Sequence, residues 1–314
     1  MTLREAIDRY VAWRRAHGAK FVSAEHTLYR FLKGIDEDIE CDAVTGDQVR
    51  AYLAGKGPLT RYRAVKYSTL SAFYRFAVSR GYASTSPLPE NEPKRPRPRP
   101  PYIYSREELR RLFGCIDASR AHVPQLDAQT FRTLLMLLYG AGLRGGEARA
   151  LTVEDVDLST AVLSVRHSKF YKSRLVPVGP RLAEQLKSYA VLRADRPCAR
   201  GRASTFLANI DGTPLHKDTV YNAFMRLLQR AGIETADNCR RAPCLHGFRH
   251  SFAVHRLTDW YRQGADVQRL LPVLSTYLGH ARLRHTQVYL SMTPELLRQA
   301  GLRFDRYTGG NRNE

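Results

Sequence analysis

The segments HGFRHSFAVH at residues 246–255 and LSTYLGHARLRHTQVYL at residues 274–290 hold the most unusual side chains of this sequence. His246 and Arg249 lie three residues apart, which places them on one face of a helix. His280 follows Gly279, and Tyr289 comes nine residues after His280. Imidazole and guanidinium groups bind anions, and a phenol can act as a nucleophile. We expect the rest of the fold to bring these groups together.

The composition indicates a folded protein that binds a polyanion. The 314 residues carry a formal net charge of +20 and a pI of about 10.1, and 43% of them are hydrophobic, enough for two cores. Nucleic acid is the first expected partner. An anionic membrane surface is a weaker alternative, because no apolar run approaches the ~20 residues of a spanning helix. We therefore expect no membrane partner.

The five cysteines are scattered and odd in number, which favours a reducing compartment over a disulfide framework. Cys239, Cys244, His246 and His250 could supply four zinc ligands, but their spacing matches no common zinc finger. We expect no metal site.

Residues 1–83 predict a helical domain. Two of its helices begin with capping boxes, Thr2 with Glu5 and Thr45 with Gln48. Helices are expected at residues 2–16, 23–34, from 45 onward and 60–80.

The fourth of these helices has a basic face. Val65, Leu70, Phe73 and Phe76 are expected to form its buried stripe. The cations outside this stripe are expected to contact DNA phosphates, although such a face is often only solvated. They are Arg61, Arg63 and Lys66.

Residues 84–101, STSPLPENEPKRPRPRPP, predict a linker, because repeated prolines remove backbone donors and prevent a helix or a central strand. Lys94 and Arg95 would add contacts to a DNA backbone. A merely solvated tether is an equally supported alternative.

Residues 102–314 predict a second, mixed α/β domain. It begins with a capping box, Ser105 with Glu108, and continues with a strongly apolar helix at 128–139. Residues 161–178 predict two short strands joined by a basic turn. Further helices are expected at 180–193, 217–231, 246–264, 266–279, 284–290 and 293–303. The expected fold class is thus mainly α, with a small antiparallel β element.

Two arginines of this domain lie in apolar surroundings. Arg144 follows the turn Gly140–Gly142 after the apolar helix, and Arg249 lies beside Phe248. A buried guanidinium needs an anionic partner. Glu147 could serve Arg144, but two such arginines in a basic protein favour a bidentate clamp on a phosphate.

These motifs resemble those of the tyrosine recombinases of the phage-integrase and Xer type. GAGLRGGEARAL at 140–151 resembles the first arginine box, HGFRHSFAVH the His-x-x-Arg box, and YLGHARLRHTQVYL at 277–290 the run that ends at the nucleophilic tyrosine. Residues 2–83 resemble the core-binding domain. The resemblance implies two domains that close as a clamp around DNA. The spacer between Asp259 and Ser275 is longer than in compact members and is expected to form an added turn or a protomer contact.

The resemblance also implies roles for single residues. Arg144 and Arg249 would hold the non-bridging oxygens of the scissile phosphate, and His280 would donate a third hydrogen bond to it. His246 would hydrogen-bond near the nucleophile and help to take its proton. Tyr289 would attack phosphorus to give a 3′-phosphotyrosyl link and a free 5′-hydroxyl.

A lysine in the β-hairpin turn would protonate the leaving oxygen. The run KSRLVPV makes Lys169 the equivalent of this general acid and leaves Lys172 as a phosphate or groove contact, but hairpin turns shift register easily and the reverse assignment stays open. Glu147 is expected to orient the cluster. His250 and His255 are expected to pack or cap a helix, and His285 to lie at a helix start. No cofactor is implied.

The resemblance implies a site-specific DNA recombinase, acting in the cytoplasm at the nucleoid. It would form a homotetramer on double-stranded core sites with inverted repeats and exchange strands through a Holliday junction. An accessory protein or a second recombinase is a further partner to consider. Leu296, Leu297 and Leu302 are expected to share a helix face that docks on a neighbouring protomer, with packing inside the chain as the alternative. A type IB topoisomerase and a catalytically silent DNA-binding protein are the alternative functions.

Overall fold

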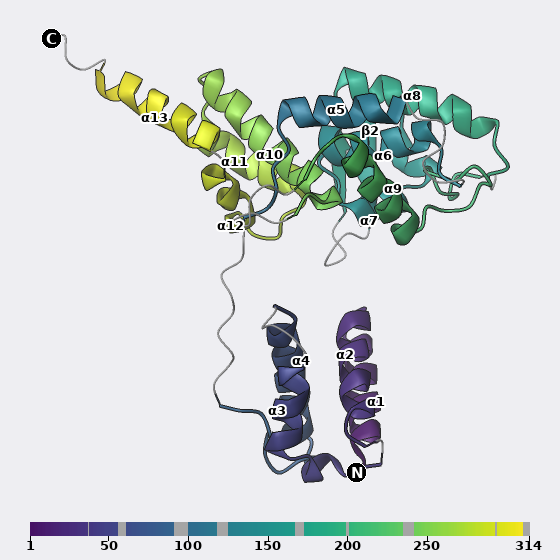
Figure 1. Ribbon diagram of the computed structural model, residues 1–314, viewed down its shortest axis with the longest axis vertical. Coiled ribbons are helices and arrows are strands. Elements are labelled where there is room, and N and C mark those ends of the chain that lie inside the picture. Colours follow the sequence, from purple (N-terminus) through teal and green to yellow (C-terminus); the bar gives the residue numbers. More distant parts are fainter. Residues whose placement is uncertain are drawn as a thin grey trace. The chain divides into compact units, whose positions relative to one another are not determined.

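The chain divides into two compact units, Met1–Pro98 and Arg99–Glu314 (Figure 1). The computed structural model describes residues 1–36, 38–55, 61–90, 100–117, 125–166, 173–198, 201–234, 242–292 and 294–309. Each unit has its own hydrophobic core. No helix in these ranges is long and apolar enough to cross a membrane.

The N-terminal unit is helical, as predicted. Its four α-helices are α1 (Leu3–Ala16), α2 (Val22–Lys33), α3 (Gly46–Ala54) and α4 (Arg61–Ser79). Both predicted capping boxes are present, because Thr2 accepts from the amide of Glu5 and Thr45 from that of Gln48. Helix α4 packs on the other three, and the ring of Tyr10 in α1 lies 5.7 Å from that of Phe73. Aromatic side chains of α1 and α4 therefore meet in a core to which Phe31 of α2 and Leu53 of α3 also belong.

The predicted buried stripe of α4 is wrong at Val65, whose exposed fraction is 43%. Phe76 is half-buried, whereas the predicted Leu70 and Phe73 are buried together with Tyr74 and Ala77. These four follow the spacing i, i+3, i+4 and i+7 of one helix face, and Val65 is rotated away from it by about 140° relative to Leu70.

The second unit is built around the apolar helix predicted at 128–139. This is α6 (Ala128–Gly140), which packs against α5 (Arg106–Asp117), α7 (Gly145–Ala150), α8 (Pro180–Ala194) and α10 (Leu245–Arg262). The remaining helices are α9 (Lys217–Arg230), α11 (Val267–Leu278), α12 (Arg284–Gln287) and α13 (Pro294–Gly309), with the 3-10 helices η2 (Val153–Asp155) and η3 (Val288–Ser291). The spacer after Asp259 is thus the end of α10, a turn and most of α11.

A small antiparallel sheet lies in this unit, in the order β1–β2–β3. Its strands are β1 (Val156–Asp157), β2 (Val162–Val165) and β3 (Arg174–Pro177), and Val165 pairs with Arg174. The sequence predicted two strands; β1 was missed because two residues show no alternation. The sheet brings Arg174, at the start of β3, against Gly279 at the end of α11.

The turn at Gly142 sets the path from α6 to α7. Its φ is +60°, and a Cβ at this position would lie 2.7 Å from a ring carbon of Phe252 in α10. Only glycine permits this backbone conformation at such a close approach. The chain therefore reverses directly against α10 and delivers Arg144 to the N-cap position of α7, a short helix that the sequence did not predict.

Helix α13 corrects the predicted docking face. Leu296 is fully buried and belongs to the core beside α10, whereas Leu297 is 53% exposed. Neighbouring residues of a helix are rotated by about 100°, so these two leucines cannot share one face. Leu297 and Phe304, seven residues apart, lie on the outer face, and Phe304 is 65% exposed.

Candidate active site

Arg249 is the most deeply buried charged side chain described, with an exposed fraction of 1%. Its Nη1 donates to the carbonyl of Gly142 at 2.7 Å, and its Nη2 to the carbonyl of Leu278 at 2.5 Å. Burial, followed by the nearby Arg144, lowers the pKa of Arg249 to about 10, so the guanidinium stays charged at neutral pH. It holds the turn after α6 and the end of α11 together around one positive charge.

Arg144 is fixed by Glu147, its partner across the first turn of α7. The Arg144 amide donates to Glu147 Oε2 at 3.0 Å, Nη1 donates to Oε1 at 2.5 Å, and Nη2 donates to the carbonyl of Gly279 at 3.1 Å. Burial alone would raise the pKa of Glu147, but hydrogen bonds from Arg174 and Arg144 and their charges outweigh it and lower that pKa to about 2. Glu147 is therefore an ionised orienting group, not a proton acceptor.

Arg174, at the start of β3, completes this network and was not assigned a role from the sequence. Its Nη1 and Nη2 donate to the Glu147 carboxylate at 3.2 and 2.9 Å, and its Nε donates to the carbonyl of Tyr277 at 2.9 Å. A Cβ at Gly279 would lie 2.8 Å from Arg174 Nη1, which explains the glycine there. The signal was present in KSRLVPV, where an arginine begins a strand beside the site.

Tyr289 lies in η3 with its phenol turned inward and an exposed fraction of 3%. Its Oη lies 2.9 Å from Nδ1 of His250. Burial raises the pKa of Tyr289, while the charges of Arg249 and Arg144 and a hydrogen bond from Arg249 act in the opposite direction. The phenol thus lies between an imidazole and the arginine cluster.

The contact with His250 corrects the sequence reading, which gave that histidine a packing or capping role. His246 and His250 are one helical turn apart on α10, with ring centroids 4.5 Å apart. His246 is exposed in the first turn of α10, and His250 lies one turn deeper, opposite η3. Helical spacing alone allows either ring to face the nucleophile; the position of η3 selects His250 for the direct contact.

His280 lies on the other side of Tyr289. The two rings are stacked, with their centroids 6.1 Å apart and an angle of 24° between their planes. Its Nδ1 lies 2.7 Å from Oγ1 of the buried Thr286. Burial, followed by the charges of Arg249 and Arg144, lowers the pKa of His280 to about 3. The ring is therefore neutral at neutral pH and can offer an N–H to an anion without adding charge.

The structure brings together five of the seven residues expected at the site. Arg144, Glu147, Arg249, His280 and Tyr289 form one connected cluster. His246 adjoins it through the ring of His250.

Lys169 and its competitor Lys172 lie outside the described residues, as do Cys239, Lys94 and Arg95. Of the expected phosphate contacts in α4, Lys66 donates to the carbonyl of Tyr52 at 2.8 Å, and its Nζ lies 4.3 Å from the centre of that ring. Arg63 is half-buried, and the Arg61 side chain is not described. Within the described ranges no cluster of three or more metal-ligating side chains occurs.

Residues 105–295 match the model of the phage integrase family. The chain belongs to this family, and its fold is that of the tyrosine recombinases.

Among its relatives is the integrase/recombinase-class protein y4rB of Sinorhizobium fredii, 33% identical over 97% of this chain and 98% of the relative. The tyrosine recombinase XerC of Chlorobaculum parvum is 32% identical over 86% and 83% of the two chains. The Tn1549 transposon integrase in complex with a circular intermediate DNA shares the fold, with a TM-score of 0.70 at 15% identity, over 97% of this chain and 99% of that one. For a lambda integrase dimer bound to a core site, the TM-score is 0.67 at 19% sequence identity, over 94% of this chain and 97% of that one.

Proposed function

We propose that this protein is a site-specific DNA recombinase that cuts and rejoins strands through a covalent 3′-phosphate link to Tyr289. The observation that carries this proposal is the buried phenol of Tyr289 beside the guanidinium groups of Arg249 and Arg144. Membership in the phage integrase family supports it.

The arginine cluster would bind the scissile phosphate. Three guanidinium groups, those of Arg144, Arg174 and Arg249, surround the single carboxylate of Glu147, so the cluster keeps an excess of positive charge. Arg144 and Arg249 would bind the two non-bridging oxygens, and neutral His280 would add a hydrogen bond. Fixed donors of this kind stabilise the additional charge of a five-coordinate phosphorus without rearrangement.

In the cutting step, Tyr289 Oη forms a bond to phosphorus and the bond from phosphorus to the 5′ oxygen breaks. The phenol proton passes to an imidazole, and the leaving oxygen takes a proton from Lys169. Since the phosphodiester energy is kept in the phosphotyrosyl bond, the reverse attack by a 5′-hydroxyl rejoins the strand without a cofactor.

The proposed substrate is a pair of double-stranded core sites with inverted repeats, held by a homotetramer. Related folds have been seen as a lambda integrase dimer on a core site and as a tetramer on a Holliday junction. We place the reaction in the cytoplasm at the nucleoid, with an accessory protein or second recombinase as a further partner. The outer face of α13, with Leu297 and Phe304, is the proposed contact between protomers.

A nicked suicide substrate tests the proposal, because the short cleaved fragment is lost and the covalent protein–DNA adduct accumulates. The wild type should give an adduct that protease reduces to a phosphotyrosyl peptide containing Tyr289. Tyr289→Phe should give none. Tyr277→Phe is the matched control, since Tyr277 Oη donates to the Pro177 carbonyl on the protein itself; it should form adduct.

Two outcomes would favour the alternatives. Absence of the adduct in the wild type would leave a silent DNA-binding protein. Adduct formation by Tyr289→Phe would instead assign the nucleophile to another residue. Relaxation of supercoiled plasmids that lack a core site would indicate a type IB topoisomerase.

A further inference from the structure

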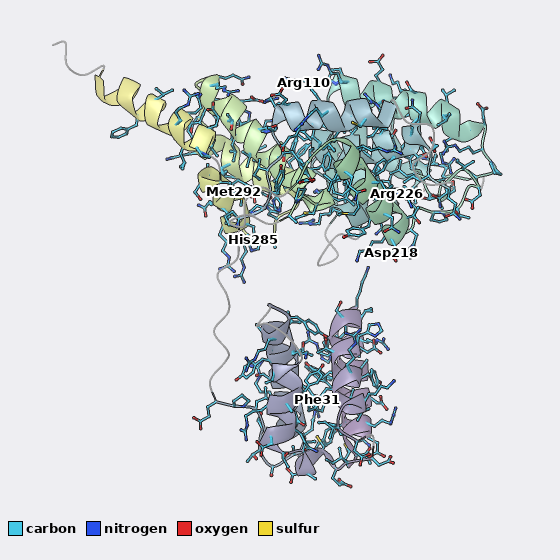
Figure 2. All side chains as sticks on the ribbon, in the orientation of Figure 1. Phe31, Arg110, Asp218, Arg226, His285 and Met292 are labelled. Carbon is cyan, nitrogen blue, oxygen red and sulfur yellow. The ribbon has the colours of Figure 1, made fainter. Side chains whose placement is uncertain are left out.

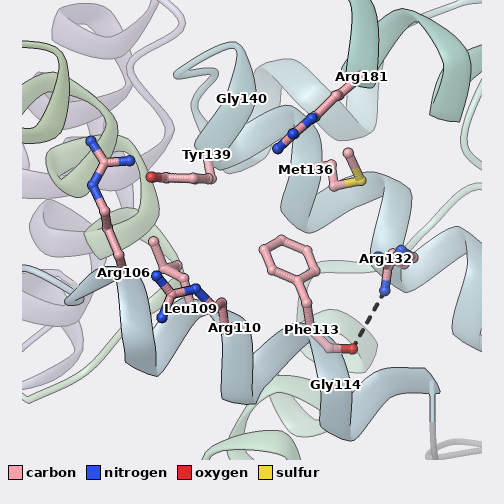
Figure 3. Close-up of a pocket in the computed structure, with 10 residues that line it drawn as sticks. All are labelled: Arg106, Leu109, Arg110, Phe113, Gly114, Arg132, Met136, Tyr139, Gly140 and Arg181. Carbon is pink, nitrogen blue, oxygen red and sulfur yellow. Dashed lines mark hydrogen bonds between the residues drawn. The ribbon is translucent and has the colours of Figure 1, made fainter. Parts of the chain in front are cut away.

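A groove of about 620 Å³ runs between α5 and α6 and reaches the start of α8 (Figure 3). Its α5 wall contains Arg106, Arg110, Phe113 and Gly114, spaced at 0, 4, 7 and 8 residues, which is one face of the helix. The wall covers nine residues, a rise of roughly 12 Å or about two helical turns at 1.5 Å per residue. None of the described residues of the candidate active site lines it.

The groove is strongly basic. Arg106, Arg110, Arg132 and Arg181 come from three helices, and none of the described lining residues is acidic. Arg106 is paired with Asp259 at 2.7 Å, and Arg132 donates to the carbonyl of Phe113 at 3.4 Å. Arg110 and Arg181 are exposed and form no ion pair with the described residues. Two cationic side chains are thus available at the rim for an anionic ligand.

The floor between these arginines is apolar, with Leu109, Phe113, Met136 and Tyr139. Phosphate backbones are bound mainly by charged and polar donors, and an apolar floor gives them nothing. A peptide with large apolar side chains buries such a floor, and carboxylates beside them would meet the arginines. The combination favours an acidic amphipathic segment over a nucleic acid.

Gly114 is a second feature of the groove wall that the packing of the described chain does not explain. It lies inside α5, where glycine costs about 1 kcal/mol relative to alanine. A Cβ built there meets no atom within 4 Å and φ is not positive, so neither close packing nor backbone conformation within the described chain requires a glycine. Its missing side chain leaves room in the groove wall for a close approach.

The position of the groove separates it from the candidate active site. Arg110 lies at one edge of the catalytic unit and His285, beside the Tyr289 segment, at the opposite edge (Figure 2). A duplex at Tyr289 would therefore not explain the four arginines. Helix α13 of a second copy fits poorly as well, because it carries Arg298, Arg303 and Arg306 against only Glu295 and Asp305.

We propose that this groove binds an acidic amphipathic segment of a different protein, about two helical turns long, with carboxylates flanking one or two large apolar side chains. The carboxylates bind Arg110 and Arg181 at the rim, and the apolar side chains cover Phe113 and Met136. Such a contact gives a regulatory or accessory protein a place on the catalytic unit away from the nucleophile.

The test uses the full chain and a fluorescent 16-residue peptide in which glutamates flank leucines and a phenylalanine at helical spacing. A second peptide carries lysine at every glutamate. Fluorescence anisotropy should show binding of the acidic peptide only. The double variant Arg110→Glu/Arg181→Glu should raise its Kd at least tenfold. The matched control Arg111→Glu/Lys187→Glu makes the same charge change at exposed positions of α5 and α8 outside the groove and should raise it less than threefold.

Gly114→Leu supplies an independent variant, because it fills the wall without changing charge and should also raise the Kd tenfold. Thermal unfolding confirms that each variant is folded. The proposal is overturned if the acidic peptide does not bind, or if the groove and control variants weaken it equally. It is also overturned if duplex DNA displaces the peptide from the groove, or if the groove variants abolish self-association of the chain.

Discussion

At the scale of single residues, the most informative contact is that between His250 Nδ1 and Tyr289 Oη at 2.9 Å. It puts an imidazole nitrogen within hydrogen-bond distance of the phenol, in a place where burial raises the pKa of Tyr289. If His250 takes the phenol proton, His250→Phe should slow covalent adduct formation by roughly 10²-fold, the lower range for general base catalysis. Single-turnover trapping with the nicked substrate at several pH values measures the effect.

His246→Phe is the comparison for this prediction, since its ring lies one turn away on the same helix. Duplex binding by both variants should equal that of the wild type, which separates a chemical defect from a folding defect. An unchanged rate in His250→Phe, with a large loss in His246→Phe, would return the proton transfer to His246.

Glu147 makes a prediction about stability and pH. Its folded pKa of about 2 lies below the ordinary value of 4.5. A lowered pKa means that the paired carboxylate stabilises the fold above pH 4.5 and loses this effect as the pH falls toward 2. The free energy of unfolding of the wild type should therefore exceed that of Glu147→Gln by an amount that shrinks by roughly 3 kcal/mol over this range.

Urea unfolding at pH 5, 4 and 3 follows the upper part of this range, over which the difference should shrink by roughly 2 kcal/mol. Glu184→Gln, at an exposed position of α8, is the control and should show no such trend. A constant difference between wild type and Glu147→Gln at all three values would show that the pairing with Arg144 and Arg174 does not depend on the charge of Glu147.

At the scale of helices and strands, local sequence signals predicted most of the fold. The capping boxes at Thr2, Thr45 and Ser105 formed as expected, because both partners lie within one turn. The two-residue strand β1 and the short helix α7 were missed, since neither is long enough to show a period.

The candidate site was predictable only in part, for the same reason. The family motifs identified Arg144, Arg249, His280 and Tyr289. Arg174 reaches Glu147 across 27 residues of sequence and His250 reaches Tyr289 across 39, and such partners depend on how β3 and η3 pack. The prediction of the buried stripe of α4 was wrong at Val65, because the apolar residues of this helix are compatible with more than one buried face.

Helix α13 makes a prediction at this scale. Its inner side chain, Leu296, packs in the core, whereas Leu297 and Phe304 face outward. Leu297→Ser/Phe304→Ser should leave the melting temperature and single-site binding unchanged, because neither side chain is buried in the monomer, and should abolish the tetrameric complex on paired sites. Gel shifts and light scattering measure assembly.

Leu296→Ala is the contrasting variant. Removing a fully buried leucine side chain should cost about 2–5 kcal/mol of stability and lower the melting temperature. If the outer-face variant also lowers the melting temperature, α13 is primarily a part of its own catalytic unit. If it assembles normally, another surface joins the protomers.

At the scale of the whole molecule, the two units and the net charge of +20 both bear on how strongly the chain binds DNA. A chain that contacts DNA with both units neutralises more phosphates than either unit alone. Each neutralised phosphate makes the dependence of affinity on salt steeper, and contacts to 6–10 phosphates correspond to a loss of roughly 10³- to 10⁵-fold in affinity between 50 and 200 mM salt.

The expected result is that the full chain shows a steeper plot of log K against log salt than a chain in which α4 has lost its basic face. Arg61→Gln/Arg63→Gln should flatten the slope by an amount that corresponds to about one to two phosphate contacts. Adduct formation at saturating protein should not change. Lys66→Gln should change the slope less, because Lys66 already donates to the Tyr52 carbonyl. Equal slopes for the wild type and the Arg61/Arg63 variant would mean that α4 does not contact phosphates and that the catalytic unit supplies the electrostatic part of binding.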